Sequence, residues 1–355
     1  MALDIFRTHT LLRAVEQLLP LTTFLRDRYF PTNDATDVFA TDDVLVEYKD
    51  GSKRLAPFVA PRKGGLTILR EGYTMERYAP PFIAPRRMLT IDELNKRGFG
   101  EALYSNLTPE QRQAALILKD ADEMSEMIAR REEAMAAELL RTNGYIMKHY
   151  ADDLSKFDEK EIRFYSGGSN PAIYTPTYDW DNASANIIAD IAAMALLLTS
   201  RGLPATDLLV APDVADTMLA DPKIQKLLDI KNYNLGMVEP ELLPAGAAKV
   251  CVLNIKGRLI SVYSYDETYE NDAGVATQYI PAGYAILTAP AAGRTLYGAV
   301  SQVEQSDGLF HTYTGRRVPK YISNAEGNTR SLTVTSCPLL IPNNKNAWIT
   351  AQVIS

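Results

Sequence analysis

The sequence is poor in the residues that build metal centres and catalytic sites. Among its 355 residues are 3 histidines and 2 cysteines. His9, His149 and His311 stand in unrelated contexts, without the helical two-histidine spacing of zinc enzymes or the neighbours of a catalytic triad. Cys251 and Cys337 lie in separate apolar, strand-like segments. We therefore interpret them as buried reduced thiols, because a disulfide framework or a zinc site needs more cysteines or closer spacing.

Motifs for nucleotide or covalent chemistry are missing too. The sequence has no phosphate-binding loop, dinucleotide fingerprint or nucleophile elbow, and the stretch Ser166-Gly167-Gly168 indicates a turn. Adjacent acids such as Glu132-Glu133 point in different directions on a helix or strand, so we interpret them as solvated charge. The sequence predicts no catalytic residue, no cofactor and no metal site, and we do not expect an enzyme.

Long hydrophobic runs are absent. The most apolar window, 187–198, has 12 residues and includes Asp190, whereas a membrane-spanning helix needs about 20 apolar residues. The N-terminus carries Asp4 and lacks the basic start and continuous apolar core of a signal peptide. We expect a chain that works in a reducing compartment and does not enter a membrane.

Positive charge is in the minority but unevenly spread. The 37 basic and 44 acidic residues give a net charge of -7, which argues against a protein that coats nucleic acid. Segment 53–97 has ten basic and four acidic residues, so it carries +6 and leaves -13 for the rest of the chain. A basic protrusion on an acidic body favours contact between copies, although a merely solvated loop remains an alternative.

The first 95 residues suggest an arm followed by a loop. Apolar residues recur at helical spacing from Leu11 to Phe30, which predicts a segment that docks on its own core or on a neighbour. Asp50-Gly51 indicates a hairpin turn. The motif at 58–62 (FVAPR) returns at 82–86 (FIAPR), and we interpret the two as the sides of one long protruding loop.

The clearest element is a long helix over about 109–143. Thr108 and Gln111 form a capping box around Pro109, and Gly144 stands where a C-terminal cap belongs. About 35 helical residues would extend about 52 Å. One apolar face keeps steps of three, four or seven: Ile117, Ala121, Met124, Ile128, Met135 and Leu139. A helix this long, without a second one to pair with, predicts a spine.

The remainder mixes strands and shorter helices. We predict a hairpin of 162–165 with 172–174, helices at 184–201, 213–219 and 222–228, and strands at 208–210, 250–255, 259–265, 284–287, 295–303, 331–336 and 347–353. The fold class is α+β. If the last strands pack on the spine helix, the central block is an insertion into the first domain.

The order of these parts resembles a known family. The resemblance is sharpest in three places. The first is Gly64-Gly65 with the extended loop to Pro85 and Met88-Leu89-Thr90, and the second is the long helix ending near Tyr145. The third is the C-terminal part, at 331–334, 338–340 and 347–353. The chain resembles the phage major capsid protein E family, the lambda-type major head proteins with the HK97-like capsid fold. The resemblance covers essentially the whole chain.

The resemblance implies a domain organisation. It predicts an N-terminal arm at 1–35, an extended loop at 36–95, a peripheral domain at 96–180 and 327–355 built on the spine helix, and an axial domain at 181–326.

The resemblance also implies a function. The expected protein assembles with itself into pentamers and hexamers of an icosahedral tailed-phage or prophage head, in the host cytoplasm, and becomes part of the virion. The expected partners are a portal, a scaffold and a decoration protein, with double-stranded DNA enclosed without sequence-specific binding. An encapsulin-like cargo shell and a soluble α/β enzyme remain alternatives.

Charge suggests where copies meet. The segment from Glu110 to Arg141 has eight acids and five bases. We expect the basic loop of one copy to lie across the spine helix of a neighbour, where opposite charges would set the register of the contact. The residues expected in this contact are Arg62, Lys63, Arg70, Arg77, Glu123, Glu126 and Glu133.

Overall fold

The structure of the chain is a computed structural model that describes residues 23–41, 44–48, 74–90, 108–150, 157–229, 243–244, 246–305, 307–324 and 329–355. The chain divides into two compact units, each assembled from separate stretches. The first draws its described residues from Met1–Val44, Ala79–Ala137 and Thr295–Leu340, and the second from Leu45–Tyr78, Glu138–Arg294 and Ile341–Ser355. These divisions differ from the predicted domain boundaries, which stay a prediction.

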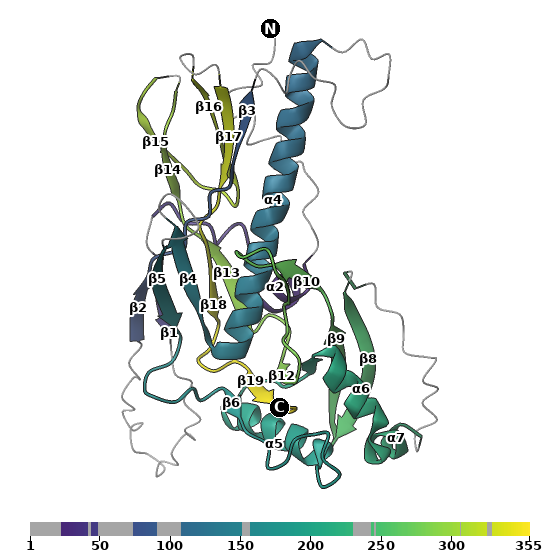
Figure 1. Ribbon diagram of the computed structural model, residues 1–355. Coiled ribbons are helices and arrows are strands. Elements are labelled where there is room, and N and C mark those ends of the chain that lie inside the picture. Colours follow the sequence, from purple (N-terminus) through teal and green to yellow (C-terminus); the bar gives the residue numbers. More distant parts are fainter. Residues whose placement is uncertain are drawn as a thin grey trace, which may run out of the picture. The chain divides into compact units, whose positions relative to one another are not determined.

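Helix α4 (Pro109–Thr142) is the longest element, with 34 residues (Figure 1). Its predicted capping box is confirmed: the Thr108 N–H donates to Gln111 Oε1 at 3.0 Å, and the Gln111 N–H donates to Thr108 Oγ1 at 3.3 Å. The predicted glycine cap is wrong. Asn143 takes the left-handed conformation with φ 56°. Gly144 instead starts strand β4 (Gly144–Tyr150), at a position where a Cβ would overlap the Ile162 carbonyl oxygen.

The first unit packs a three-stranded antiparallel sheet on the N-terminal part of α4. The sheet order is β16-β17-β3, with β3 at Arg86–Thr90, β16 at Val318–Asn324 and β17 at Thr329–Thr335. Figure 1 shows the three strands beside α4. Their shared core contains Leu89, Ile117, Ala121, Met124, Ile128, Leu332 and Val334. The apolar face predicted for the helix is confirmed, since all six of its residues are buried.

A short helix and two strand pairs add to the first unit, the second pair with residues 295–297 and 338–340. Helix α2 (Leu25–Tyr29) lies in the N-terminal segment. Strands β14 (Val300–Val303) and β15 (Phe310–Tyr313) form an antiparallel hairpin. Strand β13 (Gly293–Tyr297) pairs with β18 (Pro338–Pro342). The single strand predicted over 295–303 is therefore wrong, because Gly298 and Ala299 separate β13 from β14.

A mixed six-stranded sheet is the centre of the second unit. Its order is β6-β19-β12-β7-β9-β8, with parallel pairs only at β6–β19 and β7–β9 among the described strands. The strands are β6 (Ile173–Tyr174), β7 (Asp207–Val210), β8 (Ala247–Ile255), β9 (Arg258–Tyr265), β12 (Tyr284–Thr288) and β19 (Ile349–Gln352). Helix α5 (Ile187–Ser200) contacts β8, β12 and β19. Helices α6 (Pro212–Ala220) and α7 (Pro222–Asp229) follow β7.

Three further strand pairs lie in the second unit, apart from Val44 at the start of the first of them. The pairs are β1 (Val44–Tyr48) with β2 (Thr74–Tyr78), β4 (Gly144–Tyr150) with β5 (Phe157–Arg163), and β10 (Thr268–Glu270) with β11 (Ala276–Gln278). The hairpin predicted for 162–165 with 172–174 is wrong, because β5 pairs with β4 and β6 pairs in parallel with the distant β19. The turn predicted at Asp50-Gly51 and the repeat at 58–62 lie outside the described residues.

Replacing Ile128 by alanine tests the core between α4 and the sheet. The side chain is fully buried, so Ile128→Ala is expected to lower the free energy of unfolding by about 2–5 kcal/mol. Met127 lies next to it and is 51% exposed, so Met127→Ala should change that free energy by about 0.5 kcal/mol or less. Urea unfolding of both variants measures the difference, and equal effects would contradict this packing.

Candidate functional site

The acidic residues predicted to meet a neighbouring copy lie in two different environments on α4. Glu123 and Glu126 are half-buried, three positions apart on the N-terminal part of the helix, and i,i+3 spacing makes them neighbours on one face. Glu133 is buried. Arg77 lies at the end of β2 with an exposed side chain. Arg62, Lys63 and Arg70 lie outside the described residues.

Glu123 belongs to a charged network at the edge of β3. Arg87 Nη1 lies 2.5 Å from Glu123 Oε2 and 2.7 Å from Asp120 Oδ1, and Lys119 Nζ lies 3.8 Å from Glu123 Oε1. One turn further on, Arg130 Nη2 approaches Glu126 Oε2 at 2.8 Å. These pairs are solvent-accessible and contribute little to stability.

Glu133 has a different task, which is to hold the N-terminal segment on the helix. Its Oε1 accepts the backbone N–H groups of Phe24 at 3.1 Å and Leu25 at 2.7 Å, and its Oε2 accepts that of Arg26 at 2.9 Å. These N–H groups open α2, where the N-cap residue Phe24 provides no side-chain bond. A carboxylate from another element therefore satisfies the unpaired donors of the helix start.

The neighbouring carboxylate, Glu132, is the centre of a buried cluster that we call the anchor cluster: Arg26, Glu132, Tyr297 and Arg317. Glu132 Oε1 accepts from Arg317 Nη1 at 2.8 Å and from Tyr297 Oη at 3.1 Å. Its Oε2 accepts from Arg26 Nη1 at 2.6 Å and from Arg317 Nη2 at 3.0 Å. Four donors thus satisfy two oxygens that are shielded from water.

Electrostatics keep this carboxylate ionised. Burial alone would raise the pKa of Glu132, but the guanidinium groups of Arg317 and Arg26 outweigh burial and hold that pKa below its ordinary value. Burial, with the charge of Glu132, raises the pKa of Tyr297 to about 12, so its hydroxyl stays a donor. The two guanidinium groups thus face the buried carboxylate of Glu132, beside the buried Glu133, and Arg26 also pairs with the half-exposed Asp27.

The interpretation of Glu132-Glu133 as solvated charge is wrong. Both residues are buried because the C-terminal part of α4 is enclosed by other elements of its unit. One sequence signal points to this: Glu132 falls four residues after Ile128 and three before Met135, on the apolar face of the helix. A charge at such a position needs buried partners, and those partners could not be identified from spacing.

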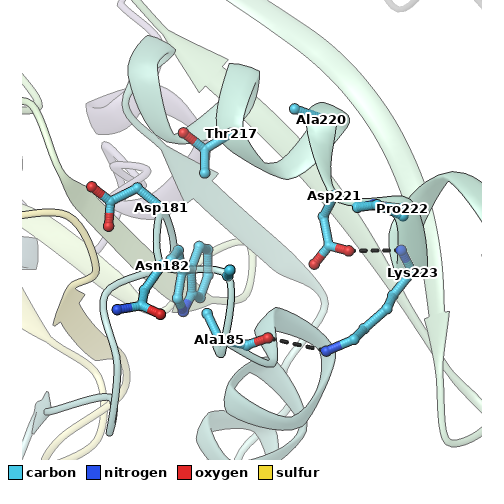
Figure 2. A pocket seen from close by; sticks show the side chains of 10 residues that line it. Asp181, Asn182, Ala185, Thr217, Ala220, Asp221, Pro222 and Lys223 are labelled. Carbon is cyan, nitrogen blue, oxygen red and sulfur yellow. Dashed lines mark hydrogen bonds between the residues drawn. The ribbon is translucent and has the colours of Figure 1, made fainter.

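A cavity of about 330 Å³ lies between the start of α5 and the junction of α6 with α7 (Figure 2). Its polar groups already serve the fold. Asp221 Oδ1 accepts the Lys223 N–H at 2.6 Å, Lys223 Nζ donates to the Ala185 carbonyl at 3.0 Å, and Trp180 Nε1 donates to Asp190 Oδ2 at 3.0 Å. These groups form no pair of nucleophile and base, and the cavity gives no support for catalysis.

Within the described part of the chain, no group of three or more His, Cys, Asp and Glu side chains could hold a metal ion. Among the helices formed by described residues, none has the length and apolar character needed to span a bilayer. Cys251 and Cys337 are both buried, as predicted, and neither forms a disulfide within the described part of the chain.

Comparisons with known proteins bear on the whole chain. The sequence profile of the family described as phage major capsid protein E matches residues 7–353. Among solved structures, one described as a capsid protein of an Escherichia coli CFT073 prophage has a TM-score of 0.65 and 14% identity, with 99% of each chain covered. A phage-related protein from Bordetella bronchiseptica RB50 has a TM-score of 0.51 and 10% identity, with coverage of 96% and 94%. No curated protein matches the chain.

Removing the charge of Glu132 tests the anchor cluster. The variant Glu132→Gln removes the buried carboxylate that Arg26 and Arg317 share and leaves Arg26 with the half-exposed Asp27. The free energy of unfolding should therefore fall by about 3–5 kcal/mol. Glu126→Gln removes the same charge from an accessible i,i+4 pair and should cost about 0.5 kcal/mol or less. Denaturant unfolding gives both values. A loss as small in Glu132→Gln as in Glu126→Gln would contradict the cluster.

The stability of the fold at acid pH should depend on the same carboxylate. The pKa of Glu132 in the folded chain lies below its ordinary value of 4.5, so its stabilisation is complete above that value and is lost as the pH falls through the folded pKa. The melting temperature of the wild type should therefore decrease below about pH 4.5, more steeply than that of Glu132→Gln. Calorimetric melting from neutral to acid pH measures both curves. Parallel curves would show that another group controls acid unfolding.

Proposed function

The chain belongs to the phage major capsid protein E family, and we propose that its copies assemble into the pentamers and hexamers of an icosahedral head around double-stranded DNA. As a member of this family it is a structural capsid protein of the virion, forms homo-oligomers, and is not an enzyme. The α+β, HK97-like capsid fold that the resemblance implied is confirmed by the shared fold of the prophage protein.

One observation carries the proposal: the family profile covers residues 7–353 of a 355-residue chain. The match therefore includes both units and not a single shared module. A net charge of -7 suits a wall that encloses DNA without binding it tightly. A portal, a scaffold and a decoration protein as partners, and assembly in the host cytoplasm, are part of this proposal.

We propose that neighbouring copies meet through the basic loop and the spine helix. The loop provides Arg62, Lys63, Arg70 and Arg77, and the accessible acids of α4 include Glu123 and Glu126. Their present partners are accessible side chains of the same chain, so an incoming guanidinium can share them at low cost. We leave Glu133 out of this contact, because its carboxylate is buried and bonded to three backbone N–H groups.

An encapsulin-like cargo shell and a soluble α/β enzyme were the alternatives from sequence. Neither is favoured, because the matching family is one of phage major capsid proteins.

Assembly of the purified chain tests the proposal. Wild-type protein is expected to form capsomers or shells that size-exclusion chromatography and negative-stain microscopy detect. The variant with Arg62→Glu, Arg70→Glu and Arg77→Glu should remain folded. The subunit concentration at which it assembles should be at least about tenfold higher than for the wild type, which corresponds to a loss of about 1.4 kcal/mol of association free energy per contact.

The matched control reverses three exposed lysines of the second unit, Lys160, Lys226 and Lys256, to glutamate. This control changes the net charge by the same amount and should assemble at the same subunit concentration as the wild type. Normal shells from the arginine variant, or equal failure of both variants, would sink the proposed contact. A wild-type chain that forms only a small stable oligomer would count against the capsid function itself.

A further inference from the structure

The turn that joins β14 to β15 exposes large apolar side chains. Phe310 is 83% exposed and Leu309 is 62% exposed, and Val303 lies on the strand opposite Phe310. We call Val303, Leu309 and Phe310 the hairpin tip. Adjacent apolar side chains in water are unfavourable, and clusters of this kind usually mark an interaction surface.

The hairpin tip is held in one conformation by bonds within its turn. The Leu309 carbonyl accepts from the Glu304 N–H at 3.0 Å, and the Glu304 carbonyl accepts from the Gly308 N–H at 2.9 Å. Asp307 Oδ1 accepts the Leu309 N–H at 3.0 Å, and Asp307 Oδ2 lies 2.8 Å from His311 Nε2. An ordered apolar surface loses less conformational entropy when it binds.

A side chain also fixes the hairpin to the neighbouring sheet. Gln305 Oε1 accepts the Ser323 N–H at 2.8 Å, and Gln305 Nε2 donates to the Ser323 carbonyl at 2.5 Å. Ser323 belongs to β16, which is one edge of the sheet β16-β17-β3. The hairpin tip is therefore placed beside the β16 edge of the first unit.

The opposite edge of that sheet carries a second apolar surface. Along the extended segment that enters β3, alternate residues are exposed: Phe82 (59%), Ala84, Arg86 and Met88 (56%). This alternation puts them on one side of the segment, and we call Phe82, Arg86 and Met88 the edge stripe. It combines two large apolar side chains with a positive charge.

The two surfaces are complementary in charge as well as in apolar character. Segment 301–313 contains Glu304 and Asp307 but no lysine or arginine, so the hairpin tip is apolar with an acidic border. The edge stripe is apolar with a basic residue, Arg86. Such pairing directs one surface to the other and disfavours contact between two like surfaces.

We propose that the hairpin tip of one copy docks on the edge stripe of the next copy. This inference rests on the proposed self-assembly and adds a contact that does not involve Arg62, Lys63, Arg70 or Arg77. Within one chain, strand β17 and strand β16 separate the two surfaces, because they lie at opposite edges of the same sheet. A contact between unlike surfaces is heterologous, so its repetition joins each copy to two neighbours and forms a ring when the rotation between copies closes.

Cross-linking in assembled shells tests this contact. Shells of a chain with Phe310→Cys and Met88→Cys are treated with a short bismaleimide and analysed on a denaturing gel. The native thiols give a low background, because Cys251 and Cys337 are buried and burial raises the pKa of Cys251 to about 11. The expected product is a ladder of covalent multimers, since each copy gives one thiol to each of two neighbours.

Three controls define the result. Each single cysteine variant should stay monomeric, and shells mixed from the two single variants should give dimers and nothing larger. The pair Phe310→Cys with Leu259→Cys, at a comparably exposed position of 63%, should give no ladder. Double-variant shells without a ladder, or multimers from Phe310→Cys alone, would overturn the inference.

A second measurement covers the case in which the cysteine pair disturbs assembly. Phe310→Ser should leave the melting temperature unchanged and reduce the shell yield at least tenfold, whereas Leu259→Ser should leave the yield unchanged. Full yield from Phe310→Ser rejects the docking contact alone. Failure of the wild type to form any shell or capsomer rejects the proposed function, and the docking contact with it.

Discussion

The first unit depends on the hydrogen bonds and ion pairs that the buried carboxylate of Glu132 forms. Its partners come from stretches far apart in sequence: Arg26 is 106 positions before it, and Tyr297 and Arg317 are 165 and 185 positions after it. Glu133, the next residue, holds the backbone at the start of α2. Because successive helical residues point about 100° apart, the two adjacent acids hold α2 from two directions, and Glu132 also binds Tyr297 and Arg317.

Forming a core around buried charges costs desolvation free energy. Buried charges lose hydration, and apolar replacements of similar volume are often as stable. What the cluster adds is geometry, because four donors on two oxygens define both the rotation and the axial position of α4 against its partners. An apolar contact would tolerate a slide along the helix. Copies that must fit the same lattice benefit from a subunit with one shape.

Local signals made much of the fold predictable, and long-range partners limited the rest. The helix over 109–143 could be predicted because its N-terminal capping box and its apolar period are local to it, although its C-terminal cap was assigned to the wrong residue. The role of Glu132 could not, since its position on the apolar face was visible but its partners were not. The hairpin predicted at 162–174 failed for the same reason: a turn-like composition is local, whereas the pairing of β6 with β19 is not. Among the candidate contact residues, Glu133 was predicted to be solvated because it follows another acidic residue, but its side chain is buried.

The amide of Gln305 has a consequence for how copies can associate. By accepting the N–H and donating to the carbonyl of Ser323, it occupies the hydrogen-bonding groups that a further strand would need at this point of the β16 edge. Open sheet edges are templates for uncontrolled strand addition. In a head, where the sheets of many copies come close together, occupied groups at this position hinder the addition of a strand from another subunit. Association is then left to side chains that can select their partner.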